Sequence, residues 1–210
     1  MANGMMNTKK ENKMESKNTI VISAFPACGK SWCFDNLKDK YDMSDSDSSN
    51  FSWIRTINEN QEEVKVRNPD FPQNYIDHIK SLLGVKDFIF VSSHDIVRNA
   101  LKEASIPYFL IYPENTTDNK CAWIARMFSR KSSIEMINFI QKNWDEFIEQ
   151  MNMEEYPFHY VLGTEENEFF LNEKVLEDVK YVWDNINKEN DVWGDKTFAK
   201  TPISPLDPWN

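Results

Sequence analysis

The feature that most constrains the fold is an alternation of short apolar runs with longer helical patterns along most of the chain. Runs rich in β-branched and aromatic residues occur at 19–24, 87–93, 107–112 and 158–163, and 41–43 is a candidate for a brief second strand. Patterns with helical spacing lie between and after them, at 30–41, 72–84, 94–104, 119–131, 132–151 and 172–186. Strands that alternate with helices form parallel sheets covered by helices on both faces. We therefore expect an α/β fold of three layers with about five parallel strands.

The chain length of 210 residues fits one domain with tails. Residues 1–18 are polar and predict a disordered N-terminal tail. The end of the chain is rich in proline and predicts an irregular C-terminal tail over 189–210. The domain itself should span 19–188, and within it residues 51–71 look irregular.

Charge and cysteine usage limit the class of protein. The net charge of -10 argues against a broad surface for duplex nucleic acid. Cys28, Cys33 and Cys121 lack metal-ligand spacing, which suggests free thiols in a reducing compartment. No segment has the roughly 20 apolar residues that span a bilayer, and the start lacks the apolar region of a secretory signal. We expect a cytoplasmic protein without a membrane partner.

The first strand ends in "AFPACGKS", which resembles a phosphate-binding loop. That pattern asks for Gly, four free positions, then Gly-Lys-Ser or Gly-Lys-Thr, and here Ala24 stands in the place of the first glycine. The backbone N–H groups of 26–31 would turn inward as a nest for anionic oxygens, and the helix that follows would add its dipole. The alternative is a chance Gly-Lys-Ser in a loop. A strand directly before it and a helix directly after it favour the phosphate loop.

This loop predicts a site for ATP and Mg²⁺. Lys30 would reach the β- and γ-phosphates, and the Ser31 hydroxyl would hold Mg²⁺. The residues assigned to binding the nucleotide are Ala27, Cys28, Gly29, Lys30, Ser31 and Trp32.

Two aspartates follow the second strand in "SDSDSSNF". Asp45 and Asp47 are two residues apart and would point the same way on an extended chain. There they could serve a metal ion and a substrate hydroxyl together, since acid–base chemistry needs a carboxylate within reach of the accepting group. The alternatives are a solvated acidic loop or an aspartate that caps a helix.

Two basic clusters complete the candidate site. His94 and Arg98 follow the third strand and are candidates for substrate binding, although turn and cap residues are the simpler reading of this stretch. Arg126 and Arg130 are four apart on one helix face within a predicted lid at about 114–132. Arginines on a lid can neutralise a transferring phosphoryl group. The alternative is a solvated basic face.

Together, "AFPACGKS", "DSDSS", "FVSSHDIVRNAL" and "RMFSR" resemble the P-loop kinases of small molecules and nucleotides, including adenylate-kinase-like and shikimate- or gluconate-kinase-like proteins. "DSDSSNFSW" and "NPDFPQNYIDHI" look more narrowly like a phage-associated and bacterial group labelled adenylate or nucleotide kinase. The resemblance covers roughly 19–186. It implies a P-loop NTPase fold with a five-stranded parallel sheet, a region for the phosphate-accepting substrate after the second strand, and an arginine-bearing lid.

The resemblance also implies roles for the acidic and basic residues. Asp45 would lie near Mg²⁺, Asp47 at the acceptor hydroxyl, and Arg98 at the phosphate of the substrate. Arg126 and Arg130 would resemble lid arginines. The chain departs from adenylate kinases where the third strand ends in "SSHD" rather than Asp-Gly, so the metal would depend on Ser31, Asp45 and water.

The expected activity is ATP-dependent transfer of a phosphoryl group, with Lys30, Asp47, Arg126 and Arg130 as the catalytic residues. A nucleoside monophosphate is the first choice of acceptor. A hydroxyl acceptor is the alternative, for example a modified nucleoside, a hydroxymethylpyrimidine in DNA or a sugar-like alcohol. A nucleotide-binding switch with weak hydrolysis and an inactive interaction protein of the same fold also stay open.

Overall fold

The computed structural model describes residues 17–193. Residues 1–16 and 194–210, which make up most of the tails predicted at 1–18 and 189–210, lie outside the described residues. The two described residues of the predicted N-terminal tail contact the domain. Lys17 forms ion pairs with Asp42 and Asp87, and Asn18 accepts a hydrogen bond from the indole of Trp183.

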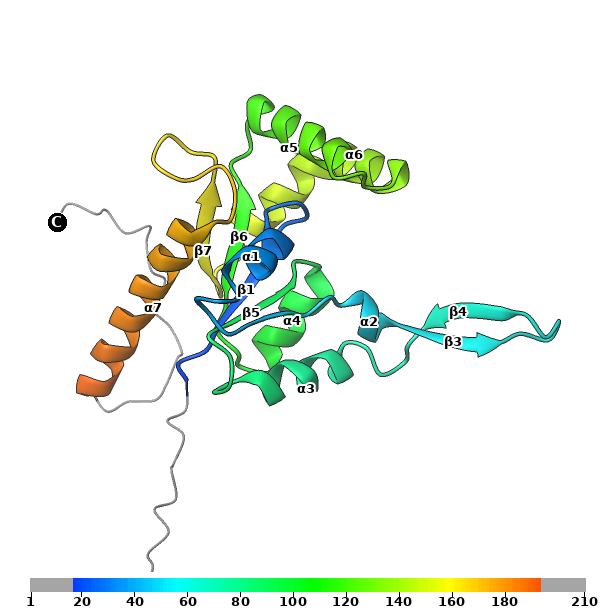
Figure 1. The fold of residues 1–210 in the computed structure, drawn as a ribbon, viewed down its shortest axis with the longest axis horizontal. Helices are drawn as coiled ribbons and strands as arrows, with labels where there is room; N and C mark the ends of the chain where they lie inside the picture. The colour runs from blue at the N-terminus through cyan, green and yellow to red at the C-terminus, as the bar shows by residue number, and fades with distance from the viewer. Residues whose placement is uncertain (1–16, 194–210) are drawn as a thin grey trace, which may run out of the picture.

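A five-stranded parallel sheet forms the centre of the molecule (Figure 1). Its order is β2-β5-β1-β6-β7, so β1 lies in the middle. The α/β class and the parallel sheet with its flanking helices are confirmed. The strands are β1 (Ile20–Ala24), β2 (Met43–Asp45), β5 (Phe88–Ser92), β6 (Phe109–Pro113) and β7 (Phe158–Leu162).

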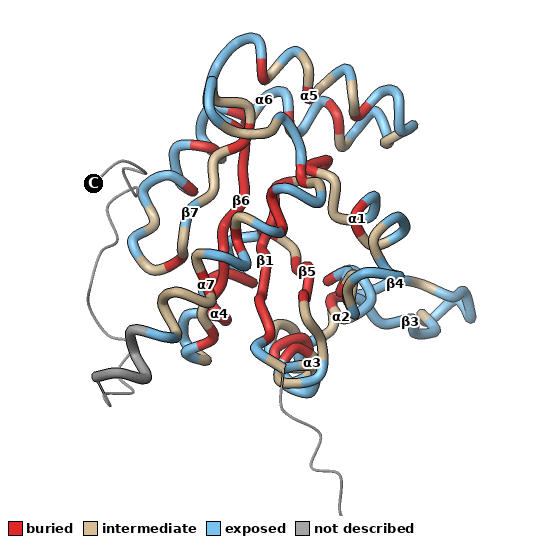
Figure 2. The backbone as a smooth tube through the Cα atoms, turned by 60° about the vertical axis from the view of Figure 1, so that its left-hand side comes forward, coloured by how far each residue is buried: buried red, intermediate tan, exposed pale blue. Residues whose placement is uncertain are grey.

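The central strands are buried on both faces (Figure 2). All five residues of β1 and all five of β6 are buried, which explains why these segments read as continuous apolar runs rather than alternating ones. Ser23 is a polar exception, and its hydroxyl donates to the carbonyl of Ser92 on the neighbouring strand.

Helices cover both faces of the sheet. The connection from β1 to β2 and the connection from β5 to β6 run in opposite directions across the sheet, so right-handed crossovers put α1 and α4 on opposite faces. The face of α1 (Lys30–Leu37) also carries α7 (Glu173–Trp193), because Lys40 pairs with Glu173 and Glu177. The opposite face of the sheet is covered by α3 (Gln73–Leu82), α4 (Asp95–Glu103) and α6 (Ile134–Asn152).

The helix α5 (Thr117–Ser129) packs against α6 above the carboxyl end of the sheet (Figure 1). Trp123 of α5 and Trp144 of α6 are fully buried and meet edge to face, with their ring centroids 6.1 Å apart. Trp144 also contacts Phe25 at the end of β1. This aromatic cluster attaches the predicted lid segment to the core of the domain.

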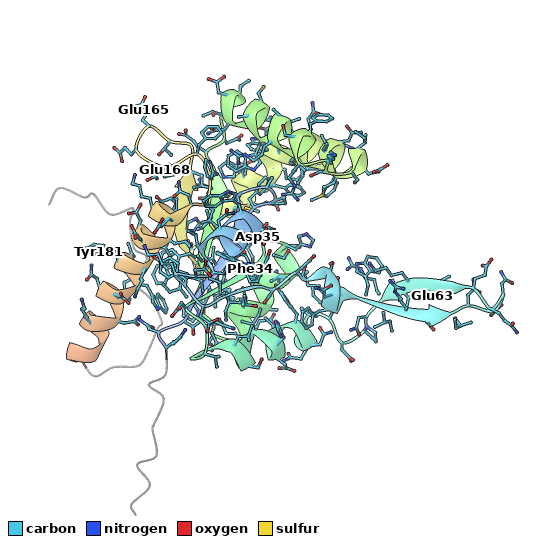
Figure 3. All side chains as sticks on the ribbon, in the orientation of Figure 1. Phe34, Asp35, Glu63, Glu165, Glu168 and Tyr181 are labelled. Atoms are coloured by element: carbon cyan, nitrogen blue, oxygen red, sulfur yellow. The ribbon has the colours of Figure 1, made fainter. Side chains whose placement is uncertain are left out.

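The expectation of an irregular segment at 51–71 is wrong. The chain there forms a short helix α2 (Ser49–Ser52) and an antiparallel hairpin of β3 (Trp53–Ile57) and β4 (Glu63–Arg67). The hairpin extends away from the domain, and Glu63 lies along it (Figures 1 and 3). Its turn contains no glycine and is closed by Asn58, whose side chain accepts from the amides of Asn60 and Glu62.

The last helix is longer than expected. α7 continues to Trp193, so the first residues of the predicted irregular tail at 189–210 are helical. Of the helices in the described range 17–193, none is both long and apolar enough to cross a bilayer.

Replacing Trp144 with alanine should destabilise the domain by about 3–5 kcal/mol, because it leaves a cavity between Phe25 and Trp123. Phe139→Ala is the matched control, since Phe139 lies on the same helix with 53% of its surface exposed. It should cost below about 1 kcal/mol. Urea denaturation measures both, and equal losses would mean that Trp144 is not part of the core.

Candidate functional site

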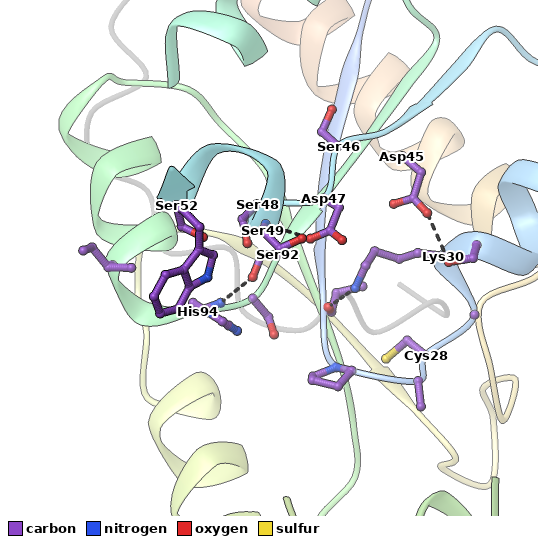
Figure 4. A pocket seen from close by; sticks show the side chains of 18 of the residues that line it. Cys28, Lys30, Asp45, Ser46, Asp47, Ser48, Ser49, Ser52, Ser92 and His94 are labelled. Atoms are coloured by element: carbon purple, nitrogen blue, oxygen red, sulfur yellow. Dashed lines mark hydrogen bonds between the residues drawn. The ribbon is translucent and has the colours of Figure 1, made fainter. Parts of the chain in front are cut away.

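A cleft of about 960 Å³ opens at the carboxyl ends of β1, β2 and β5 (Figure 4). Ligands of open parallel α/β sheets bind beyond this edge. The cleft collects side chains from the loop between β1 and α1, the segment from β2 to α2, the hairpin base, the loop after β5, and α5. Of the predicted site residues, these line it: Ala27, Cys28, Gly29, Lys30, Ser31, Trp32, Asp45, Asp47, His94, Arg126 and Arg130.

The last position of the loop between β1 and α1 has a backbone conformation that only glycine adopts without strain. Gly29 has a φ of +117°, and a Cβ there would lie 2.8 Å from the carbonyl oxygen of Leu171. The amide of Leu171 in turn donates to the carbonyl of Cys28 at 2.7 Å. Among the described residues, the amides of Gly29, Lys30 and Ser31 have no hydrogen-bond acceptor. These donors are therefore available to an anion at the start of α1.

Lys30 places its ammonium at the floor of the cleft. Its Nζ donates to the carbonyl of Ala24 at 2.6 Å. Burial lowers the pKa of Lys30 below its usual range. A partly desolvated ammonium gains from a nearby anion, because the anion favours its charged form. The site is thus electrostatically prepared for a negative ligand.

Ser31 and Asp45 form an oxygen pair beside this ammonium (Figure 4). The Ser31 hydroxyl donates to the Asp45 carboxylate at 3.1 Å. No cluster of three or more His, Cys, Asp or Glu side chains suited to a metal occurs in the described residues. A cation at Ser31 and Asp45 would take its remaining ligands from substrate and water, as Mg²⁺ does in phosphate-binding sites.

Asp47 lies past the end of β2 rather than on it. The strand ends at Asp45, and one oxygen of Asp47 accepts from the amide of Ser49 at 2.8 Å at the start of α2. The two aspartates are therefore not held side by side on one extended strand as expected. Asp47 combines the cap-like contact with an exposed carboxylate at the edge of the cleft, where its second oxygen can meet a ligand.

The two basic residues after β5 have different positions. His94 lines the cleft, and desolvation together with the nearby charges of Lys30 and Arg67 lowers its pKa, which favours the neutral imidazole at pH 7. Arg98 is 4% exposed and does not line the cleft, which corrects its predicted contact with substrate. Its guanidinium donates to Glu154 at 2.6 Å and to the carbonyl of Ser93. Arg98 thus supports the cleft wall from behind.

Arg126 and Arg130 both reach the cleft from α5, but Arg126 is held in place. Its guanidinium stacks on Trp123 at 4.4 Å and donates to the carbonyl of Ala27 at 3.1 Å. It also lies 5.5 Å from the ring of Phe169. Neither arginine pairs with a carboxylate among the described residues. Both charges are therefore available to an anion.

Several cleft residues were not identified from the sequence. Most follow β2 or come from the hairpin. The sequence did not predict the hairpin, which brings the start of β3 and the end of β4 together at the cleft. They are Ser46, Ser48, Ser49, Ser52, Trp53, Arg67, Asn68 and Phe71, together with Ile96 at the start of α4.

A scan against protein-family models finds no match to the chain, and a search of the curated proteins finds none either. The chemistry of the cleft is therefore the ground on which a function can be assigned.

Gly29→Ala should lower the free energy of unfolding by at least about 1 kcal/mol, because alanine strains the backbone and meets the Leu171 carbonyl. Ala27→Gly is the matched control, since Ala27 already has a φ of +62° in the same loop. It should change stability by less than about 1 kcal/mol. Denaturant unfolding monitored by fluorescence compares them, and a fully stable Gly29→Ala protein would rule out the close approach.

Proposed function

We propose that the protein is a P-loop phosphotransferase that moves the γ-phosphoryl group of ATP to a small acceptor, with a nucleoside monophosphate as the first candidate. The observation that carries this proposal is the loop from Ala24 to Ser31. It joins a central buried strand to a helix, and it offers unpaired amides together with the Lys30 ammonium at the floor of the cleft. Strand, small-residue loop, lysine and hydroxyl occur in the order that triphosphate binding requires.

The donor half of the cleft fits a triphosphate in charge and in hydrogen-bonding capacity. The amides of Gly29, Lys30 and Ser31 donate toward the start of α1, where the helix dipole also favours an anion. Lys30 adds an ammonium group whose pKa is lowered by burial and which a bound anion would help to keep charged. A bound phosphate group would satisfy these donors and offset the desolvation of the ammonium.

Ser31 and Asp45 fit Mg²⁺ because they offer oxygen ligands beside the phosphate-binding amides. Bound Mg²⁺ would neutralise charge on the phosphate oxygens. The hydrogen bond between the Ser31 hydroxyl and Asp45 keeps both groups together before a metal arrives.

Asp47 is the candidate for orienting the acceptor. One oxygen is engaged by the Ser49 amide, which fixes the carboxylate at the cleft edge and leaves the other oxygen for an acceptor hydroxyl. Arg126 and Arg130 face the same cleft from α5 and would stabilise the negative charge that develops during transfer. Since Arg126 is already stacked and hydrogen-bonded, its charge needs little reorganisation.

Lys30→Met should abolish the rise in melting temperature that ATP with Mg²⁺ produces in the unaltered protein, since binding stabilises the folded state. It should also reduce phosphoryl transfer at least about 100-fold. Lys38→Met serves as the control, because Lys38 is exposed at the end of the same helix and outside the cleft. Thermal shift and ADP release are the measurements. Retained turnover in Lys30→Met would reject the role of Lys30, and no ATP-dependent shift in the unaltered protein would reject the proposed function.

Asp47→Asn should reduce kcat by about 10²–10⁴-fold while the ATP-dependent thermal shift remains. Asparagine keeps an oxygen for the Ser49 amide, so α2 should stay folded. Asp35→Asn is a control on the exposed surface of α1 (Figure 3). Steady-state kinetics with a panel of nucleoside monophosphates and small alcohols separate the two effects. Equal turnover in both variants would remove Asp47 from the reaction.

A further inference from the structure

The β3–β4 hairpin contributes to the cleft only through its base. Trp53 begins β3 and Arg67 ends β4, and these two residues face each other across the ladder. Both line the cleft, whereas the next pair on the same face, Arg55 and Lys65, does not. The hairpin therefore adds one cross-strand pair to the site and carries the rest of its length into solvent (Figure 1).

Arg67 lines the cleft, whereas Arg98, the arginine that the sequence suggested for the substrate phosphate, does not. Arg98 is buried and neutralised by Glu154, so it has no charge to offer a ligand. Arg67 is exposed, has no carboxylate partner among the described residues, and lies with its guanidinium 4.5 Å from the Trp53 ring. Stacking on an aromatic ring orients a guanidinium without using its N–H donors. Those donors remain free for the two oxygens of a phosphate.

Three serine hydroxyls near the hairpin base have no hydrogen-bond partner among the described residues. Ser48, Ser52 and Ser93 are only 7%, 5% and 5% exposed, yet no described residue makes a hydrogen bond to their hydroxyls. All three line the cleft. Each free hydroxyl can donate one hydrogen bond and accept others, so together they offer a ligand in the cleft a polar edge.

The walls beside these hydroxyls are apolar and aromatic. Trp53 follows Ser52 directly, and Phe71 is tied to the same turn because its amide donates to Asn68, whose amide donates to Ser52. Ile96 faces the cleft from the start of α4. Aromatic and aliphatic walls around a few hydrogen-bonding groups suit a flat ring with polar edges.

We propose that the hairpin base forms the acceptor site, in which Arg67 binds a phosphate, Trp53 and Phe71 line the space for a planar heterocycle, and Ser48, Ser52 and Ser93 hydrogen-bond its edge. This inference rests on the proposed phosphotransferase function. It assigns the acceptor to the phosphorylated heterocycles, that is, to mononucleotides rather than sugar-like alcohols. It also replaces Arg98 by Arg67 as the arginine that recognises the acceptor.

The hairpin carries charges of both signs beyond its base. Arg55, one pair further along the hairpin, is exposed and engaged with Glu63 at 3.2 Å. Beyond it lie Glu59 and Glu62 near the turn, which would repel a longer chain of phosphates. Lys65 lies 5.4 Å from the same Trp53 ring, but of the cations of the hairpin only Arg67 lines the cleft.

The test is calorimetric titration of nucleoside monophosphates, with a non-hydrolysable ATP analogue and Mg²⁺ present to occupy the donor half. Arg67→Gln should weaken the binding of the preferred monophosphate about 10–100-fold, because a charge-assisted hydrogen bond is lost. It should leave the affinity for the ATP analogue unchanged. Arg55→Gln is the matched control on the same face of the hairpin and should bind like the unaltered protein. Ribose 5-phosphate should bind at least about 10-fold more weakly than the monophosphate, since it lacks the ring.

Each contrary outcome overturns a defined part of the proposal. Unchanged affinity in Arg67→Gln would remove Arg67 from the acceptor site, and equal losses in Arg55→Gln and Arg67→Gln would indicate a longer anionic ligand. Ribose 5-phosphate binding as tightly as the monophosphate would remove the ring contact. If ATP is turned over with an alcohol acceptor while no monophosphate binds, this inference fails and the phosphotransferase function stands. If the ATP analogue does not bind, the proposed function itself fails.

Discussion

The contact between Gly29 and Leu171 is the constraint on which the rest of the site depends. The backbone of the β1–α1 loop passes so close to the Leu171 carbonyl that no side chain fits between them. Leu171 then closes the contact from its own side, with its amide on the Cys28 carbonyl and its carbonyl accepting from the Cys33 thiol at 3.3 Å. The loop is thus held from outside by a distant segment, since Cys33 and Leu171 are 138 residues apart in the sequence. Its inner side, which carries the free amides, is left open to the cleft.

Arg126 of α5 is held against the same loop. Arg126 donates to Ala27 of the same loop while Trp123, its neighbour by one helical turn, is buried against Trp144. The phosphate-binding candidate loop, the α5 helix and the segment at Phe169 therefore form one packed unit. The charge of Arg126 is therefore positioned by packing and by its contact with the loop. Positioned charges of this kind lose little free energy to reorganisation when a ligand binds.

The parts of the fold that the sequence predicts are those set by local pattern. The continuous apolar runs of β1 and β6 reflect burial on both faces, and the Gly-Lys-Ser stretch lies at a strand end because its motif is local. The hairpin was missed because both its faces are solvent-exposed and its turn is closed by Asn58 without glycine. Arg98 was misplaced for a different reason, since its partner Glu154 is 56 residues away and only the packing of α4 near the end of α6 brings them together. The local sequence placed Arg98 one turn into a helix, but it could not show whether the side chain faces the cleft or the interior of the protein.

The isolation of the hairpin has a consequence for the behaviour of the protein at high concentration. β3 pairs with β4 alone, so each strand keeps one edge with unpaired backbone groups. One face of this ribbon is apolar along Ile54, Val66 and Val64, while the other carries Arg55, Lys65 and Glu63. Open edges with an apolar face are templates for strand addition by a second molecule, and charged neighbours of both signs oppose it. Salt screens these exposed charges, so the protection that they give the open edges of the hairpin should weaken as ionic strength rises.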